Sequence, residues 1–358
     1  MGNCLNAVRP QPPIGYVFTS TAEGLKLDDA KAKARPRFEF DLFLEREGAQ
    51  AVTFDDIPRA GSVPRLLSRI GRSAPAVALA ALRNTDYRSI ITSGENVGFA
   101  AAFFSSLDRT GPSIDVVTHG SFFGSRYMPS VARLLRANRR VRYLTLCNSL
   151  RNQMIGRFGF PEDRVINTGY GVDTEFFEPR PLPERARPVI ASAGAATRDY
   201  RTLVAATQDL TADIRIATDS SWFPTAVDVS RDRLPANCDV RSYGNYSGLR
   251  ELYASADFVV VPLYPAFHAC GLAVIAEAMA MGKAVITTRI EGRSDFVIEG
   301  ENAFYVEPGD VAGLRARIDE LLRDPARARE MGAAARRQMV QRFSLEAYVE
   351  RMVEGRSV

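Results

Sequence analysis

A short segment that begins at Cys270 has the residue types needed to hold an anion beside a group that bears hydroxyls. Gly271 precedes an apolar stretch of helical character, and a glycine lets a ligand approach the backbone closely. The N–H groups of the first helical turn and the helix dipole favour an anion at this point. Glu277 follows about one and a half turns later, where a carboxylate can accept hydrogen bonds from sugar hydroxyls. A nucleoside diphosphate offers both parts, a pyrophosphate and a ribose.

The two histidines of the sequence are further candidates. His119 follows the apolar run at 114–118 and precedes Gly120, so it lies at the carboxyl end of a predicted strand. Ligands of open α/β sheets bind beyond these strand ends, which favours a site role over that of a structural histidine. His268 stands two residues before Cys270.

The elements that must position these residues alternate between strand and helix. Alternation of this kind predicts parallel sheets covered by helices on both faces, and the chain length suits two α/β domains. The segment 174–188 is rich in proline and charge, which is typical of an interdomain linker. The predicted strands begin at Ile14, Ser89, Ile114, Tyr143, Val189, Ile214, Phe258 and Ala284.

Several classes of protein are disfavoured by the composition. The four cysteines are widely spaced without a CxxC pair, so we expect neither a disulfide framework nor a zinc site, and a reducing compartment fits. The N-terminus lacks the pattern of a signal peptide. Residues 258–276 contain no charged side chain, but Pro262 and Pro265 argue against a membrane helix. We interpret them as a strand, a loop and a helix.

Positive charge is concentrated in the first half of the chain. Residues 1–172 carry 23 Lys and Arg against 15 Asp and Glu, whereas residues 173–358 carry 23 against 27. An amphipathic helix is predicted near 63–72, with arginines on one face beside leucines and an isoleucine, a pattern that suits an anionic membrane surface. A solvated face in an arginine-rich protein is the alternative, and no nucleic-acid motif is present. The arginines expected on the membrane or acceptor side are Arg65, Arg69, Arg72, Arg133, Arg136, Arg139 and Arg140.

Four motifs resemble the family 4 retaining glycosyltransferases. They are Thr-His-Gly at 118–120, the stretch from 148 to 179 that contains Gly-Val-Asp, the glycine loop within 189–206, and the segment 270–310. The resemblance implies the α/β GT-B fold, in which two Rossmann-like domains face a central cleft. It further implies an acceptor-side domain over 1–173, the linker 174–188, a donor-binding domain over 189–340, and a closing helix over 341–358 that crosses back to the first domain.

The resemblance also implies roles for individual residues. Glu277 would hold the donor ribose, while Gly271, Leu272 and Ala273 would line the donor phosphates, next to Cys270. Arg198 takes the place of the family's phosphate-binding lysine, close to Gly194. His119 would approach the donor sugar and phosphate as the catalytic-site histidine, and His268 would contact the donor sugar. Gly24 stands where the family has its acceptor-side glycine loop. The family's phosphate-binding arginine is replaced by Ala193, and the first acid of its paired-acid motif by Ala269.

The function that the resemblance implies is sugar transfer, with retention of configuration, from a nucleotide sugar, most commonly a UDP-sugar. No Asp-x-Asp pair occupies a suitable loop, so we expect no metal and no other cofactor. The basic first domain predicts a cytoplasmic enzyme, peripheral on the inner membrane face, with a lipid acceptor such as diacylglycerol. A polysaccharide, lipopolysaccharide or soluble acceptor is the alternative, as is a non-catalytic protein that binds nucleotide sugars. The oligomeric state stays open.

Overall fold

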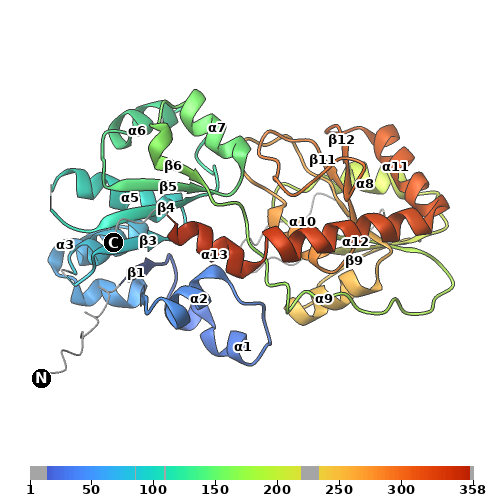
Figure 1. The fold of residues 1–358 in the computed structure, drawn as a ribbon, viewed down its shortest axis with the longest axis horizontal. Helices are drawn as coiled ribbons and strands as arrows, with labels where there is room; N and C mark the ends of the chain where they lie inside the picture. Colours follow the sequence, from blue (N-terminus) through green and yellow to red (C-terminus); the bar gives the residue numbers. More distant parts are fainter. Residues whose placement is uncertain (1–13, 85, 109, 219–233, 355–358) are drawn as a thin grey trace, which may run out of the picture. The chain divides into compact units, whose positions relative to one another are not determined.

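The computed structural model describes residues 14–84, 86–108, 110–218 and 234–354. Their strands form two six-stranded sheets with helices around them (Figure 1). The chain divides into two compact units. The first unit comprises the described residues of 1–25, 43–117 and 130–143, and the second those of 26–42, 118–129 and 144–358.

The first sheet has the strand order β2-β1-β3-β4-β5-β6. The pairings of β1 with β2 and β3, and of β3 with β4, are parallel. Ile90 and Ile91 are neighbours whose side chains point to opposite faces, and both are wholly buried, so the sheet is covered on both sides. The strands are β1 (Ile14–Val17), β2 (Gln50–Val52), β3 (Ser89–Thr92), β4 (Ser113–Thr118), β5 (Val141–Thr145) and β6 (Val165–Asn167).

The helices in this half of the chain are short. Gly98 on α5 illustrates how closely they pack, because a Cβ there would lie 2.4 Å from Cγ1 of Val116 on β4. The α-helices are α1 (Leu27–Lys31), α2 (Glu39–Arg46), α3 (Ser62–Arg69), α4 (Ser73–Leu82), α5 (Glu95–Ser106), α6 (Met128–Leu135) and α7 (Asn148–Gly156). Single 3₁₀ segments lie at η1 (Glu23–Leu25), η2 (Phe54–Arg59) and η3 (Glu162–Arg164).

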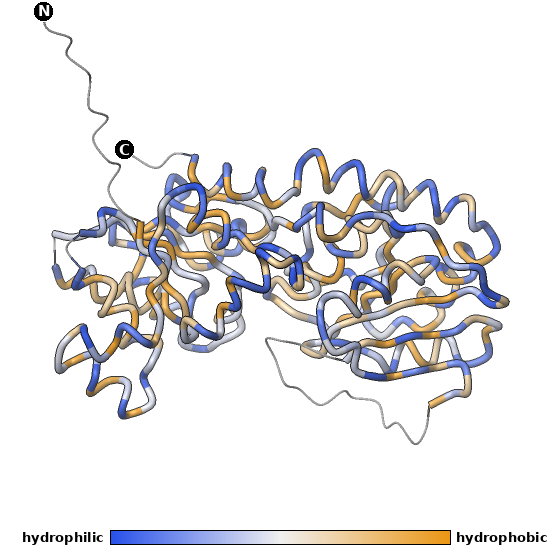
Figure 2. Tube along the Cα trace, turned by 90° about the horizontal axis from the view of Figure 1, so that it is seen from below, coloured by the Kyte–Doolittle hydropathy of each residue, from blue (hydrophilic) through white to orange (hydrophobic). Residues whose placement is uncertain are grey.

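The second sheet has the order β12-β11-β10-β7-β8-β9, and all of its pairings are parallel. Its core contains the wholly buried Ile190, Phe258 and Ile286. Hydrophobic residues run through the strands, and hydrophilic ones recur along the outer helices (Figure 2). The strands are β7 (Val189–Ala193), β8 (Asp213–Ala217), β9 (Cys238–Arg241), β10 (Phe258–Val261), β11 (Ala284–Thr288) and β12 (Ala303–Val306).

Most helices of this half begin at a side-chain cap. Asp199, Asn245, Asp310, Asp324 and Ser344 each accept a hydrogen bond from a backbone N–H of the first turn, which satisfies an otherwise unpaired donor. The helices are α8 (Tyr200–Thr207), α9 (Tyr246–Ser255), α10 (Leu272–Ala280), α11 (Val311–Arg323), α12 (Pro325–Arg342) and α13 (Leu345–Val353).

The last two helices are separated by a break at Phe343 and Ser344. There the chain pairs with Val172, whose N–H donates to the Phe343 carbonyl and whose carbonyl accepts from the Leu345 N–H. A Cβ on Gly171 would lie 2.5 Å from that of Tyr348, so α13 packs tightly on the segment that follows β6. The role expected for residues 341–358, a helix that crosses back to the first domain, stays a prediction.

All eight predicted strands are confirmed in place, and the segment 258–276 is β10, a loop and the first part of α10, as predicted. No described helix is long and apolar enough to cross a membrane. The described cysteines Cys147, Cys238 and Cys270 are free thiols. The first sheet ends at Asn167 and the second begins at Val189, with turns but neither helix nor strand over 174–188.

Candidate functional site

Helix α10 begins with the geometry expected of an anion site. Gly271 is its N-cap with φ 78°, a left-handed conformation that favours glycine. A Cβ there would also lie 3.2 Å from the Leu263 side chain. No side chain caps this helix, in contrast to α8, α9 and α11 in the same unit. The backbone N–H groups of its first turn, at Leu272 and Ala273, therefore have no side-chain acceptor and suit an oxyanion.

Glu277 lies on the second turn of α10, and its side chain is almost fully buried. Its Oε2 accepts a 2.9 Å hydrogen bond from the Tyr253 hydroxyl on α9. Burial raises the pKa of Glu277 to about 8, against the lowering effects of this bond and of the positive charge on Arg198. At neutral pH the carboxyl is mostly protonated, so it can donate one hydrogen bond as well as accept others.

Arg198 is folded back onto the loop that follows β7. Its Nε donates to the Ala193 carbonyl over 2.8 Å and its Nη1 to the Ala196 carbonyl over 2.9 Å, and its side chain is largely buried. Gly194, at φ 98°, leaves room for the guanidinium, because a Cβ there would lie 2.5 Å from Nη2. Thr197 is held at φ 60°, a strained conformation for a β-branched residue. The loop thus fixes one positive charge near the start of α10.

Arg198 also acts electrostatically on Cys270, whose pKa burial raises to about 11 although the arginine lowers it. The structure therefore brings Gly194, Arg198, Cys270 and Glu277 together in the second unit. Tyr253 is the member of this cluster that the sequence reasoning missed. It lies on a different helix, 24 residues before its partner, and no local motif marks it.

The two histidines lie side by side. The loops that carry them are joined by a 2.9 Å hydrogen bond from the Ala269 N–H to the His119 carbonyl. A Cβ on Gly120 would lie 3.1 Å from the Cα of His268. Burial lowers the pKa of His268, and the charge of His119 lowers it further. The two predicted site histidines thus lie close together, in the loops that follow β4 and β10.

At the two positions where alanine replaces the family's charged side chains, the backbone makes a hydrogen bond to another part of the site. The carbonyl of Ala193 holds Arg198, and the N–H of Ala269 holds the His119 loop. Gly292 approaches the same loop so closely that a Cβ there would lie 1.9 Å from the His268 carbonyl oxygen. These contacts tie the loop before α10 to two other segments of the second unit.

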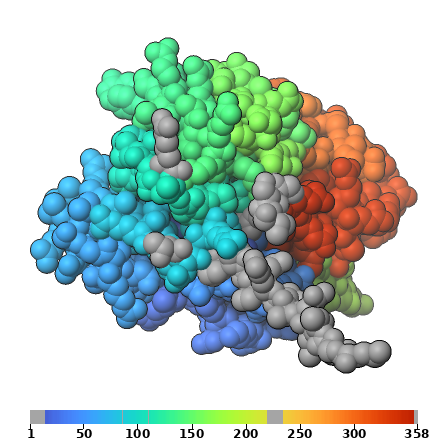
Figure 3. Space-filling model, turned by 60° about the vertical axis from the view of Figure 1, so that its left-hand side comes forward, coloured from blue at the N-terminus to red at the C-terminus, as the bar shows by residue number. Residues whose placement is uncertain are grey.

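The predicted basic face lies on α3 and just after it, in the first unit. The helix ends at Arg69, so Arg65 and Arg69 lie on it while Arg72 precedes α4, and all three arginines are exposed. Leu66 is 61% exposed and Ile70 is 63% exposed. Apolar side chains on a surface helix usually face the core, so this exposed pair is unusual. Figure 3 shows α3 in light blue and the α6 region in green, both at the surface.

The predicted arginines between positions 133 and 140 differ in exposure. Arg133, Arg136 and Arg139 are exposed in the first unit. Arg140 instead donates to the carbonyls of Ser105, Asp108 and Thr110, so it caps the C-terminal end of α5. Its guanidinium is thus engaged within the fold, while its place on the membrane or acceptor side stays a prediction. Gly24 is exposed in η1, where its N–H donates to Thr21 Oγ1.

A polar groove of about 480 Å³ lies beside α7, in the second unit. Asp295 forms part of its wall and accepts hydrogen bonds from the N–H and Nδ2 of Asn148 and from Nδ2 of Asn167. It thereby caps the N-terminus of α7. The sequence reasoning missed this groove, because Asn148 and Asp295 are 147 residues apart and belong to two different motifs.

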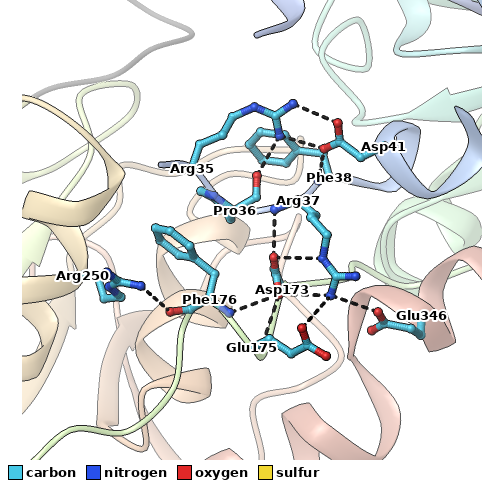
Figure 4. A network of polar contacts seen from close by, with 10 residues as sticks. All are labelled: Arg35, Pro36, Arg37, Phe38, Asp41, Asp173, Glu175, Phe176, Arg250 and Glu346. Carbon is cyan, nitrogen blue, oxygen red and sulfur yellow. Dashed lines mark hydrogen bonds and ion pairs between the residues drawn. The ribbon is translucent and has the colours of Figure 1, made fainter. Parts of the chain in front are cut away.

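An ion-pair network around the buried Asp173 holds the segment 26–42 within the second unit (Figure 4). The Asp173 carboxylate accepts from the Arg37 backbone and side chain and from the N–H groups of Glu175 and Phe176. Arg37 also bonds Glu346 on α13 at 3.1 Å. The sequence reasoning missed this network, because Arg37 and Asp173 are 136 residues apart.

The described residues contain no group of three His, Cys, Asp or Glu side chains placed to hold a metal ion. The expectation of a reaction without metal or other cofactor stays a prediction.

Residues 230–338 match the family model of "Glycosyl transferases group 1". Glycogen synthase of Mycobacterium tuberculosis is 34% identical over 99 residues, which are 28% of this chain and 23% of that protein. The MMP alpha-(1->4)-mannosyltransferase of Mycolicibacterium hassiacum is 27% identical over 221 residues, 59% of this chain and 52% of that protein. The match covers about a quarter of the length of the first of these relatives and about half of the second.

Solved structures share the fold over almost the whole chain. The HepE protein of Anabaena, in complex with UDP-glucose, aligns with a TM-score of 0.69 at 18% identity, over 96% of this chain and 98% of that one. Sucrose-phosphate synthase from Thermosynechococcus elongatus aligns with a TM-score of 0.68 at 19% identity, over 96% and 97%. The expected fold of two Rossmann-like domains is confirmed. The chain therefore has the GT-B fold, and its residues 230–338 are similar to the group 1 glycosyl transferases.

Proposed function

We propose that this protein transfers a sugar from a nucleoside diphosphate sugar to an acceptor. The observation that carries the proposal is the convergence of three features in the second unit: the uncapped start of α10, the guanidinium of Arg198, and the buried carboxyl of Glu277. Two of these features favour phosphate oxygens, and the third suits ribose hydroxyls.

The chemistry follows from where charge develops. As the bond from the sugar to the diphosphate breaks, negative charge accumulates on the leaving phosphate. The N–H groups at Leu272 and Ala273, together with Arg198, are arranged to stabilise that charge without a metal. His119 and His268 are assigned to the donor sugar. By resemblance to the family the configuration at the sugar is retained, through attack on the same face, and the donor is a UDP-sugar.

For the acceptor, we propose a lipid at an anionic membrane surface. The support is the α3 face, which comprises α3 and the residues just after it, where Leu66 and Ile70 are exposed together with Arg65, Arg69 and Arg72. Arginines attract anionic headgroups, and exposed apolar side chains gain free energy when they enter the headgroup region. This assignment makes the protein a peripheral enzyme of glycolipid synthesis.

A saccharide acceptor is the second candidate. Relatives of this chain include proteins named glycogen synthase and "Capsular polysaccharide biosynthesis glycosyltransferase CapM". A third candidate is a protein that binds nucleotide sugars without turnover, since Ala193 and Ala269 lack the charged side chains of the family.

The test is a donor screen with purified protein, first without acceptor and then with total membrane lipids or soluble glycans, with products identified by mass spectrometry. We expect a sugar-bearing lipid from a UDP-sugar. Glu277→Ala should weaken UDP binding in calorimetry about a hundredfold, because the ribose loses a buried hydrogen-bond partner. The exposed Glu301→Ala is the control. UDP-sugar binding without transfer or hydrolysis would favour the non-catalytic candidate, and unchanged affinity in Glu277→Ala would remove this residue from the site.

A further inference from the structure

Two neighbouring loops of the second unit display aromatic rings to solvent. The loop after β4 carries Phe122, which is 41% exposed, and Tyr127, which is 60% exposed. The loop after β10 carries Tyr264 and Phe267, which are 38% and 41% exposed. Apolar rings gathered at the surface mark binding sites more often than isolated exposed residues do.

These loops touch each other next to the histidine pair. The Ala269 N–H donates to the His119 carbonyl, and the Phe267 ring would lie 3.8 Å from a Cβ on Gly124. Two glycines, at 120 and 124, allow this close approach. The Phe267 ring therefore lies against the loop that carries His119, which is assigned to the donor sugar.

Phe267 also borders the polar groove beside α7. Its carbonyl accepts a 3.1 Å hydrogen bond from Nε2 of Gln153, which lines the groove. Its ring lies 5.1 Å from the guanidinium carbon of Arg157, another lining residue. Ring and groove thus form one continuous surface within the second unit.

The groove has the chemistry of a site for hydroxyl groups. One wall is a polar face of α7, with the amides Asn152 and Gln153 and with Arg157, and the other includes Glu291 and Asp295. Amides and carboxylates accept from hydroxyls, and arginine donates to them. Arg157 and Arg293 balance the charges of the two acids, so a neutral ligand fits better than a strongly charged one. The volume of about 480 Å³ falls in the range of small-molecule sites.

We infer that this surface binds a sugar ring of the acceptor, with the apolar face of the ring on Phe267 and its hydroxyls toward Asn152, Arg157 and Glu291. The C–H face of a pyranose packs on an aromatic ring, while its edge offers donors and acceptors in the plane. The inference rests on the proposed function only in naming the sugar as acceptor. It applies equally to a free saccharide and to the saccharide part of a glycolipid.

Saturation-transfer NMR tests it on the full-length protein, with excess UDP present and no donor sugar. The probes are glucose, galactose, maltose and lactose at millimolar concentration, and, in a second arm, neutral vesicles that contain a glucosyl lipid. We expect saturation of ring protons in at least one probe. Signal from free saccharides identifies the sugar itself as the ligand, and binding to glycolipid vesicles alone identifies a lipid-linked one. Absence of binding in both arms overturns the inference.

Variants separate the site from general surface binding. Phe267→Ala should weaken saccharide binding about fivefold and Phe267→Tyr should keep it, because only the first loses the ring. Asn152→Leu should weaken binding about tenfold. The controls are Phe103→Ala, which removes a phenylalanine that is 37% exposed in the first unit, and the exposed Gln341→Leu on α12. Equal loss in Phe103→Ala, or a change of oligomeric state in Phe267→Ala without loss of binding, overturns the inference.

Hydrolysis of UDP-sugar by the wild-type protein distinguishes the two proposals. Absence of any turnover in the wild-type protein, with saccharide binding intact, contradicts the proposed function and leaves the saccharide site standing.

Discussion

The hydroxyl of Tyr253 donates a 2.9 Å hydrogen bond to Oε2 of Glu277, and this bond joins α9 to α10. Both side chains are buried, and burial raises the pKa of each. Because Tyr253 already holds one carboxyl oxygen, the orientation of Glu277 is fixed before a ligand binds. A ribose would therefore meet an acid that needs no rearrangement, which reduces the entropic cost of binding.

Glu277 should make stability depend on pH. Its pKa rises from 4.5 to about 8 on folding, so between these values the folded chain keeps a proton that the unfolded chain releases. The free energy of unfolding therefore falls as pH increases through this window, by an amount on the order of 4 kcal/mol, and stays lower above it. Glu277→Gln is neutral at every pH and should lack this part of the decline. Urea denaturation at about pH 5 and about pH 9 measures the difference.

The comparison must be made between variant and wild type, because Lys283 acts in the opposite direction. Its pKa is lowered by burial from 10.5 to about 8, so it raises stability as pH increases between these values. The exposed Glu301→Gln serves as control. Identical pH dependence in Glu277→Gln and wild type would show that the carboxyl is ionised in the folded state.

Gly271→Ala should damage both stability and nucleotide binding. The residue has φ 78°, and a Cβ would press on Leu263 at 3.2 Å, so we expect a loss of about 1–2 kcal/mol. Gly300→Ala is a matched control, because Gly300 has φ 75° but nothing within 4 Å of its Cβ position. Backbone strain should lower the stability of both variants. Only Gly271→Ala should also weaken UDP binding in calorimetry. Equal UDP affinity in the two variants would show that the start of α10 does not bind the phosphates.

Arg198→Lys tests whether the guanidinium fork is needed. Lysine keeps the charge but cannot bond the Ala193 and Ala196 carbonyls while it also faces a ligand, so UDP affinity should fall about tenfold. Arg201→Lys makes the same exchange three residues away at an exposed position of α8. Full affinity in Arg198→Lys would mean that only the charge matters, and full affinity in Arg198→Ala would exclude a phosphate role.

The central strands were predictable because they are buried on both faces. Ile90, Val260 and Ile286 belong to short continuous apolar runs, which is the pattern of parallel sheets. The four strands that escaped prediction, β2, β6, β9 and β12, are the edge strands of the two sheets. Each has only one neighbouring strand, and β2 and β9 each contain exposed polar residues, so their sequences carry a weaker signal.

The residues of the candidate site could be predicted only where they lie close together in the sequence. Gly271 and Glu277 stand in one helix, where spacing alone fixes their relation, and they were found. Tyr253 reaches Glu277 from another helix, and Asp295 reaches Asn148 across the chain, so only the tertiary fold reveals these pairs. Arg140 gives a further example. Its sequence position suggests only a basic face, and the carbonyls to which it donates are seen only in the fold.

The α3 face makes the last prediction. Leu66→Ser with Ile70→Ser should reduce binding to anionic vesicles. The two wild-type side chains are more than 60% exposed and gain free energy when they enter the headgroup region, and serine does not. Replacing Arg65, Arg69 and Arg72 by glutamine should reduce it about a hundredfold at low salt, at roughly 1 kcal/mol for each charge. Vesicle flotation with anionic and with neutral lipids measures both effects.

Two controls show whether the α3 face itself causes vesicle binding: added salt, and an apolar substitution at a distant position. Added salt should release the wild-type protein, since screening weakens attraction between arginines and headgroups. Val340→Ser removes an apolar side chain that is 45% exposed on α12, and it should leave flotation unchanged. Because α3 lies outside the unit that contains Glu277, the serine variants should keep wild-type UDP affinity. Wild-type protein that stays unbound to anionic vesicles at low salt would end the membrane assignment and leave a saccharide as the remaining acceptor.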